Sequence, residues 1–377
     1  MSLEKPRPLE SKIYIRRLTK FFCFFLLIFS FLAIDEAMAQ RKNYKLKRKN
    51  RKVSRYKGGS IHFDKNKRYL TGGIGLDALN YFGDLAPASE ASSTDISFTK
   101  PGVSVFVAYR YTPNLTFRGQ FSWGRLKGDD FKSADPYGDD SKFRYVRNLS
   151  FRNDIKELSF IGVWDIFGNH GTFLNRMHFT PYIFGGVGIF HHNPRAKVPE
   201  LDRNGNPLDQ AGEWYPLRKL GTEGQLSEHY DIKKYSVVQP SFPVGLGIRA
   251  ELDKRWDFEF EIGYRFLLTD YIDDVSGQYV DLGALDNDFA RTMSDRSRET
   301  TAVSTGENRD FEAINAITTT ITYTSEFDGN DYTVFAGYGQ PHIDSNRGFA
   351  TQNDIYIVTS IRLSYVITGT FKRAKFR

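Results

Sequence analysis

The sequence predicts an all-β protein that folds as an antiparallel transmembrane β-barrel, with eight strands or, as an alternative, ten. Three observations support this class: a strictly alternating segment at 256–266, seven more segments that can be read as strands (the glycine-rich one at 179–190 without a clear phase), and an N-terminal leader typical of exported proteins. In 256–266 every second side chain is apolar, and the other phase holds Asp257, Glu259, Glu261 and Arg265. Successive side chains of a strand point to opposite faces. An apolar face and a charged face fit lipid outside a barrel and a polar lumen inside it.

Residues 1–39 are predicted to be a secretory signal peptide. Six basic residues precede an apolar run of fourteen residues at 21–34, which is too short to span a bilayer as a helix. Ala37-Met38-Ala39 fits a small-x-small cleavage site, so we expect cleavage near Ala39 and an outer-membrane location. An uncleaved signal anchor is the alternative. The single cysteine, Cys23, lies in the apolar run, so the mature protein should have no disulfide and no cysteine metal site.

Residues 40–68 are predicted to be a basic, disordered periplasmic segment. The stretch 41–57 has ten Lys or Arg, no acidic residue and no apolar period. The whole chain has a net charge of +7, so the rest of the chain is net negative. The stretch could be a solvated leader, or it could bind anionic lipid headgroups or peptidoglycan-side polymers. Nucleic acid is not expected as a partner of an exported protein. The cations are Arg41, Lys42, Lys45, Lys47, Arg48, Lys49, Arg51, Lys52, Arg55 and Lys57.

Eight segments have the pattern of membrane-spanning strands, and the gaps between them alternate between short and long. Outer-membrane barrels have short periplasmic turns and long external loops, so both ends of the predicted barrel region, 69–371, face the periplasm. A basic tail at 372–377 follows. Eight is an even number of strands and closes a small barrel. The predicted strands are 70–80, 102–112, 115–124, 157–166, 179–190, 242–250, 256–266 and 354–367, and the long loops are 81–101, 125–156, 191–241 and 267–353.

The last loop is too long to be bare. We expect a short helix at 282–298 and an extra hairpin formed by 316–323 and 331–338. If that hairpin enters the membrane, the barrel has ten strands.

The outward phase of the predicted strands lacks charged residues in the clearest segments. A Lys or Arg on the lipid face at mid-bilayer costs about 2–4 kcal/mol, which gives this absence a physical reason. A soluble secreted barrel or sandwich is the alternative. The residues predicted to face lipid are Val103, Val105, Val107, Phe117, Phe121, Trp123, Phe160, Trp164, Trp256, Phe258, Phe260, Ile262, Ile357, Ile361 and Leu363.

The inward phase contains five cations and six anions that nearly cancel. An eight-stranded barrel is only wide enough for side chains to fill, so we predict a lumen plugged by ion pairs. Ion conduction or a proton relay is the alternative. The predicted network consists of Asp77, Arg110, Arg118, Glu157, Asp165, Arg249, Asp257, Glu259, Glu261, Arg265 and Arg362.

Other motifs give candidate sites that we do not favour. Asp202, Asn204, Asn206 and Glu213 have the spacing of a calcium loop. Pro207 stands where the turn glycine is expected, so we expect an ordinary Asn-Gly hairpin tip. His191 and His192 are adjacent on a strand and should point in opposite directions. No nucleophile elbow supports Ser122 or Ser159. We therefore predict no metal, no cofactor and no enzymatic activity.

Four segments together resemble a known family: 75–85, 123–130, 147–154 and 270–277. The most specific parts are Asn80-Tyr81-Phe82-Gly83-Asp84 and Asp270-Tyr271-Ile272-Asp273-Asp274. They resemble a family of uncharacterised outer-membrane β-barrels that includes relatives of PorG, the barrel component of the type IX secretion system. The resemblance runs from about residue 70 to the end of the sequence. It implies an outer-membrane protein that contacts periplasmic secretion-ring proteins, and it brings no catalytic residues.

Our leading hypothesis is a non-enzymatic outer-membrane barrel that acts as a membrane anchor or accessory subunit of an envelope assembly, with type IX protein secretion as the specific expectation. The expected partners are outer-membrane lipid and the secretion-ring proteins. Two alternatives are a small outer-membrane pore and a surface binding module that uses the external loops.

Overall fold

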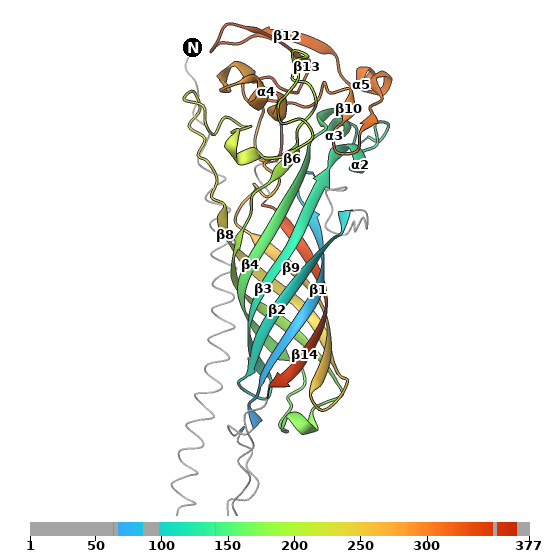
Figure 1. Ribbon diagram of the computed structural model, residues 1–377, viewed down its shortest axis with the longest axis vertical. Coiled ribbons are helices and arrows are strands. Elements are labelled where there is room, and N and C mark those ends of the chain that lie inside the picture. Colours follow the sequence, from blue (N-terminus) through green and yellow to red (C-terminus); the bar gives the residue numbers. More distant parts are fainter. Residues whose placement is uncertain (1–62, 64–66, 86–97, 140, 350–352, 368–377) are drawn as a thin grey trace, which may run out of the picture. The chain divides into compact units, whose positions relative to one another are not determined.

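The computed structural model describes residues 63, 67–85, 98–139, 141–349 and 353–367. The predictions for the signal peptide, the basic stretch 41–57 and the tail 372–377 lie outside these residues. Eight long strands form a closed antiparallel β-barrel (Figure 1), which confirms the predicted fold class. They are β1 (Leu70–Phe82), β2 (Lys100–Arg110), β3 (Leu115–Asp129), β4 (Ser150–Asp165), β5 (Phe179–His191), β8 (Val238–Glu251), β9 (Trp256–Leu267) and β14 (Ile355–Ile367).

The barrel closes between its first and last strands. β1 pairs with β2 on one side and with β14 on the other, and the seam runs from Leu70↔Ile367 to Phe82↔Ile355. Every other barrel strand pairs with its neighbours along the chain. Because the strand number is even, Leu70 and Ile367 lie at the same end as the short connections 111–114, 166–178 and 252–255. We call the opposite end, where the long connections lie, the mouth.

The ten-strand alternative is wrong. Two short strands, β6 (Arg195–Lys197) and β7 (Trp214–Pro216), extend the sheet from β4 but do not enter the barrel, because β3 and β4 pair directly and close it. The expected extra hairpin does form, as β12 (Thr320–Thr324) and β13 (Asp331–Phe335), but it is a separate two-stranded sheet. Strands of five residues are also too short to cross a bilayer, which takes about 9–11 residues.

The loop predicted at 125–156 is shorter than expected, because β3 and β4 continue well beyond the other strands. Residues 124–129 pair with 150–155, and their inward side chains Leu126 and Phe151 are fully buried in a hydrophobic cluster at the mouth. Arg125 and Asp154, which alone would suggest a solvated loop, form a cross-strand ion pair on the outer side. The sequence alone does not indicate that the two strands continue here, because their outward residues change from apolar to charged.

The outer face of the barrel is an apolar belt. No outward-facing residue is charged within 70–78, 103–109, 115–123, 158–164, 179–189, 242–250, 256–266 and 355–367. Large side chains there are exposed, for example Leu158 at 58%. Of the residues predicted to face lipid, the exposed ones are Val103, Val105, Val107, Phe121, Trp123, Phe160, Trp164, Trp256, Ile262, Ile361 and Leu363.

Four of the predicted belt residues are less exposed. Phe117, Phe258 and Phe260 are half-buried. Ile357 shares the outward phase, as predicted, but is only 9% exposed. Asn80 and Tyr264 flank it in the register, so neighbouring side chains cover it.

The long connections fold into short elements beyond the mouth (Figure 1). The helix expected at 282–298 is present only as η5 (Leu282–Ala284) and α4 (Asp288–Ser294), and Asn287 caps α4 by accepting a hydrogen bond from the backbone N–H of Ala290. No helix in the described part of the chain is long and apolar enough to cross a membrane. The other elements are α2 (Asp130–Ser133), α3 (Lys142–Arg147), η3 (Phe173–Asn175), η4 (Leu217–Lys219), β10 (Thr301–Ala302), β11 (Glu307–Asn308) and α5 (Phe311–Ile317), of which η3 lies in a short connection at the opposite end.

These loops have hydrophobic cores of their own. One core joins Val198, Leu217 and Leu220 of one loop to Leu282 and Met293 of another. A second core joins loop 130–149 to the last loop, through residues such as Val146 and Ile314. We call the described residues of 130–149, 192–237 and 268–354 the loop cap. Because its segments bury apolar surface against one another, the cap is a folded unit and not a set of independent loops.

We predict that Gly245→Ala destabilises the barrel and Gly119→Ala does not. A Cβ at Gly245 would come within 2.5 Å of Phe184 Cζ and 2.6 Å of the Cα of Gly263, whereas a Cβ at Gly119 would meet nothing within 4 Å among the described residues. Overpacking typically costs about 1–3 kcal/mol. Urea unfolding of protein refolded in micelles measures both changes. Equal stability of the two variants would contradict the prediction.

Candidate functional site

The lumen contains a network of buried ion pairs, and Glu261 of β9 lies near its centre. Glu261 forms an ion pair with Arg118 of β3. Its Oε2 also lies 2.7 Å from Nη1 of Arg362 of β14. The hydroxyl of Tyr182 of β5 donates to Glu261 Oε1 at 2.8 Å. Four strands that are distant in sequence therefore meet at one carboxylate, and all four side chains are buried.

Two further groups of pairs extend the network toward both ends. Toward the mouth, Glu157 accepts hydrogen bonds from Arg265 Nε at 3.2 Å, from the Ser241 hydroxyl at 3.1 Å and from the Tyr356 hydroxyl at 2.9 Å. Toward the other end, Asp165 lies 3.3 Å from Arg110 and 3.2 Å from Arg249.

The remaining members of the predicted network are also inside. Glu259 pairs with Arg249 at 3.0 Å, and Asp77 accepts hydrogen bonds from the hydroxyls of Ser104 at 3.2 Å and Ser360 at 2.6 Å. The structure thus places all eleven predicted residues in the lumen.

Sequence reasoning missed a charged partner of this network, Arg176, as well as the hydroxyl donors Tyr182, Ser241 and Tyr356. Arg176 lies in the connection 166–178, outside any strand, and its guanidinium turns into the barrel end to pair with Asp257 at 2.9 Å. A residue in an irregular connection has no phase along a strand, so no signal in the sequence placed it. Only the path of the connection in space brings it to Asp257.

These side chains occupy the lumen. A small cavity lined by Tyr69, Phe106, Arg118 and Glu259, among others, measures about 20 Å³, which is room for about one water molecule. Removing one partner of a buried ion pair typically costs about 3–5 kcal/mol, because the other charge is left without compensation. The buried pairs join strands that are distant in the sequence.

At the mouth, the two most specific motifs of the sequence meet. The hydroxyl of Tyr81, from the first motif, donates to two acceptors, Asp273 Oδ2 of the second motif and Asp354 Oδ1, each at 2.7 Å. All three side chains are buried. Burial raises the pKa of Asp273 and of Asp354 well above the ordinary value; the charge of Asp354 adds to the rise at Asp273, and the charge of Asp270 adds to the rise at Asp354. A single hydroxyl proton cannot satisfy two buried carboxylates, so this arrangement favours one additional proton on the pair.

Other acids crowd the same place. Burial raises the pKa of Asp270 to about 9, and the negative charges of Asp84 and Asp273 add to the rise. Burial likewise raises the pKa of Asp274 to about 6, and the Tyr235 hydroxyl donates to Asp274 at 2.6 Å. The backbone amide of Ile272 donates to Asp354 at 2.9 Å. The first of these bonds joins the start of the last loop to loop 192–237, and the second joins it to the residue just before β14.

Two buried arginines connect the loops above this cluster. Arg147 of α3 pairs with Asp130 at 2.8 Å and donates to the backbone oxygens of Asp84 and Arg347. Arg347 in turn pairs with Glu223 at 2.9 Å. Four separate segments of the chain are therefore linked through two guanidinium groups, whose rigid forks suit several acceptors at once.

The calcium-loop candidate forms a hairpin tip. Asp202 accepts hydrogen bonds from the backbone amides of Asn204 and Asn206, both at 2.8 Å, and from the Asn206 side chain at 3.1 Å. Its carboxylate is thus engaged by the chain itself. Glu213 is exposed. Among the described residues, no group of three or more His, Cys, Asp or Glu is arranged to hold a metal ion.

The two adjacent histidines point to opposite sides. His191 is exposed on the outer face, whereas His192 is buried, with its Nε2 2.9 Å from the backbone oxygen of Ser236. Burial lowers the pKa of His192 to about 4, so its ring is neutral at physiological pH. Ser159 is buried on the inward side, as its phase required, and Ser122 shares that phase but is half-buried.

Comparison with known proteins adds a family match and several structural likenesses. Residues 64–206 match a family described as a domain of unknown function, DUF6089. No curated protein matches the chain. The resemblance to PorG-related barrels stays a prediction.

Solved structures with a similar chain path are outer-membrane or surface proteins. Neisserial surface protein A has 7% identity and a TM-score of 0.30, covering 80% of this chain and 97% of its own. OprG of Pseudomonas aeruginosa has 10% identity and a TM-score of 0.32, covering 81% and 98%. A major outer membrane protein of Thermus thermophilus has 11% identity and a TM-score of 0.33, covering 79% and 99%. At such values the likenesses carry no argument about function, and the fold class rests on the strand register.

We predict that the folded state loses stability as the pH rises from about 4 to about 9. The pKa of Asp270 is about 9 in the folded state against an ordinary value of 3.8, so over this range folding takes up a proton that the unfolded chain has released. Urea unfolding from pH 5 to pH 9 measures the loss. Asp270→Asn, which is neutral throughout, should reduce the slope; an unchanged slope would contradict the assignment.

Proposed function

We propose that this protein is a non-enzymatic, closed outer-membrane β-barrel that anchors the loop cap at the cell surface as an accessory subunit of an envelope assembly. The observation that carries this proposal is the filled lumen. Glu261, Glu157 and Asp165 each have arginine partners inside the barrel, and the interior leaves only about 20 Å³ in the cavity beside Arg118. A barrel filled in this way is suited to holding a position in a membrane and not to passing solutes.

The apolar belt supports the outer-membrane location. A soluble protein rarely exposes contiguous apolar patches larger than a few hundred Å², whereas here the uncharged outward face surrounds the whole barrel. A lipid environment removes the free-energy cost of exposing this apolar surface to water. The predicted signal peptide agrees with export, since outer-membrane proteins must first leave the cytoplasm.

The anchor role is supported by the loop cap and by the sequence resemblance. A folded cap on a closed barrel provides a fixed surface at a distance from the membrane, which is what an assembly subunit needs. The resemblance to PorG-related barrels suggests type IX protein secretion as the assembly. In that case the basic stretch 41–57 would face the periplasm and contact the secretion-ring proteins by charge.

We expect the purified protein to be electrically silent in planar bilayers, because its lumen is filled by paired side chains. The matched variant Arg118→Ser/Glu261→Ser/Arg362→Ser removes the central pairs and should produce measurable conductance. Stable unitary currents from the wild-type protein would contradict the anchor proposal and favour the pore.

Crosslinking in intact envelopes tests the assembly. We expect the full-length protein to recover periplasmic ring proteins, and a variant in which 41–57 is replaced by an uncharged Gly/Ser segment of equal length to lose them. Replacement keeps the reach of the stretch and removes only its charge. Recovery of the same proteins by both variants would exclude charge contact by this stretch, and recovery of barrel-assembly proteins alone would oppose the assembly role.

A further inference from the structure

The apolar belt ends in a cationic surface where β3 and β4 extend past the other strands. Cross-strand neighbours on the outer face form successive rows, of which the apolar row contains Val105, Phe121, Leu158 and Ile189. The next row toward the mouth contains Val103, Trp123, Lys156 and His191. Beyond it come Arg125 opposite Asp154, and then Lys127, Arg152 and Arg195. Rows are two residues apart, about 6.6 Å along the strand.

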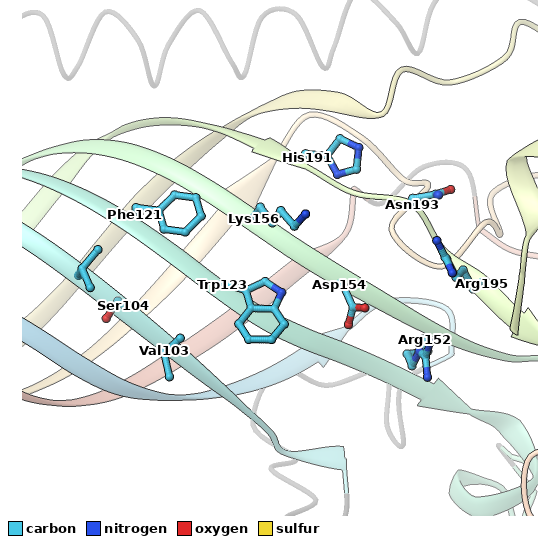
Figure 2. A pocket seen from close by; sticks show the side chains of 11 residues that line it. Val103, Ser104, Phe121, Trp123, Arg152, Asp154, Lys156, His191, Asn193 and Arg195 are labelled. Atoms are coloured by element: carbon cyan, nitrogen blue, oxygen red, sulfur yellow. The ribbon is translucent and has the colours of Figure 1, made fainter.

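A groove of about 740 Å³ lies across these rows. Figure 2 shows Phe121 and Trp123 toward one end, Arg152 and Arg195 toward the other, and Lys156 and Asp154 between them. One part of its lining is therefore continuous with the apolar belt and the other part is charged. The groove opens on the outer face of the barrel, and the buried Ser104 also lines it.

The charges in this groove are not balanced. Asp154, its single carboxylate, is already engaged by Arg125, with Nε 2.5 Å from Oδ1 and Nη2 3.2 Å from Oδ2. Within the described residues, Arg152, Lys156 and Arg195 form no ion pair. The net charge of the lining is thus positive even with His191 neutral.

The arrangement of the arginines points to an anion. Arg152 lies directly opposite both Lys127 and Arg195 in the register, and like charges directly opposite each other on a sheet are destabilising. The Arg152 guanidinium stacks on the ring of Trp214, with Cζ 4.5 Å from the ring centroid, which fixes its position without neutralising it. Its buried Nε has no hydrogen-bond partner among the described residues. An anion held between Arg152 and Arg195 would relieve this repulsion.

We propose that this groove binds a membrane lipid whose headgroup carries phosphate, in the leaflet on the loop-cap side. The phosphate groups lie against Arg152, Lys156 and Arg195, and an acyl chain follows Val105 and Phe121. This inference rests on the membrane location in the proposed function. The headgroup layer begins where the hydrocarbon ends, and the belt turns cationic within one row of Trp123, a residue typical of that boundary. Arginine forks and a lysine suit phosphate oxygens.

Binding to refolded full-length protein in neutral phosphatidylcholine nanodiscs tests this proposal. The probes are a diphosphorylated lipid A, the same lipid without its phosphates, and inorganic pyrophosphate. The variant Arg152→Gln/Lys156→Gln/Arg195→Gln is compared with Lys219→Gln/Lys233→Gln/Lys234→Gln, which removes three charges of loop 192–237 outside the groove. Native mass spectrometry counts bound lipid and gives relative affinities.

We expect the phosphorylated lipid to bind at least about tenfold more weakly to the groove variant, corresponding to about 1.4 kcal/mol. The control variant should bind it as the wild type does, and the lipid without phosphates should bind weakly to all three. The proposal is overturned if the groove variant binds the phosphorylated lipid as tightly as the wild type does. It is also overturned if the wild type binds pyrophosphate as tightly as the lipid, which would indicate a site for free phosphate. Wild-type protein that enters nanodiscs but binds no lipid refutes this inference alone; wild-type protein that does not enter them refutes the membrane location as well.

Discussion

The structure depends on one constraint, the narrow interior of an eight-stranded barrel. Such an interior has no room for bulk water, so each inward side chain must pack against others, and each inward charge must find a partner inside. Glu261 satisfies this requirement with Arg118, Arg362 and Tyr182. The strands that supply these groups are far apart in sequence, so the network also fixes their register.

The same constraint applies at the mouth, where the barrel meets the loop cap. Tyr81, Asp273 and Asp354 join the ends of two strands to the last loop, and Arg147 and Arg347 connect the loops above them. Burial raises the pKa values of the acids here, and the negative charges of neighbouring acids add to the rise. The cap is therefore held by polar groups at its base and by hydrophobic cores in its interior.

The residue types on the outer face of the barrel follow the environment expected at each level. Where hydrocarbon is expected, the outward residues are uncharged around the full circumference, and on β3 and β4 they become charged toward the mouth, beginning with Lys156. The position of Trp123 next to Lys156 in the register marks this change. The lumen, the cap and the outer belt thus differ in composition: paired charges inside, mixed polar and apolar residues in the cap, and apolar residues on the belt.

The sequence by itself determined the approximate positions of the eight strands, the two faces of seven of them and the eleven predicted charged residues of the lumen, because the alternation of apolar and polar residues along a strand is a local pattern. The glycine-rich strand at 179–190 showed no clear alternation. The sequence could not determine which arginine meets which carboxylate, because that depends on the register between distant strands. It missed Arg176, which has no strand phase, and the upper parts of β3 and β4, whose outward residues are charged. The row of Lys127, Arg152 and Arg195 and the burial of Ile357 likewise exist only once the strands are paired. Tertiary structure decided these features, since they arise from contacts between segments that no local pattern connects.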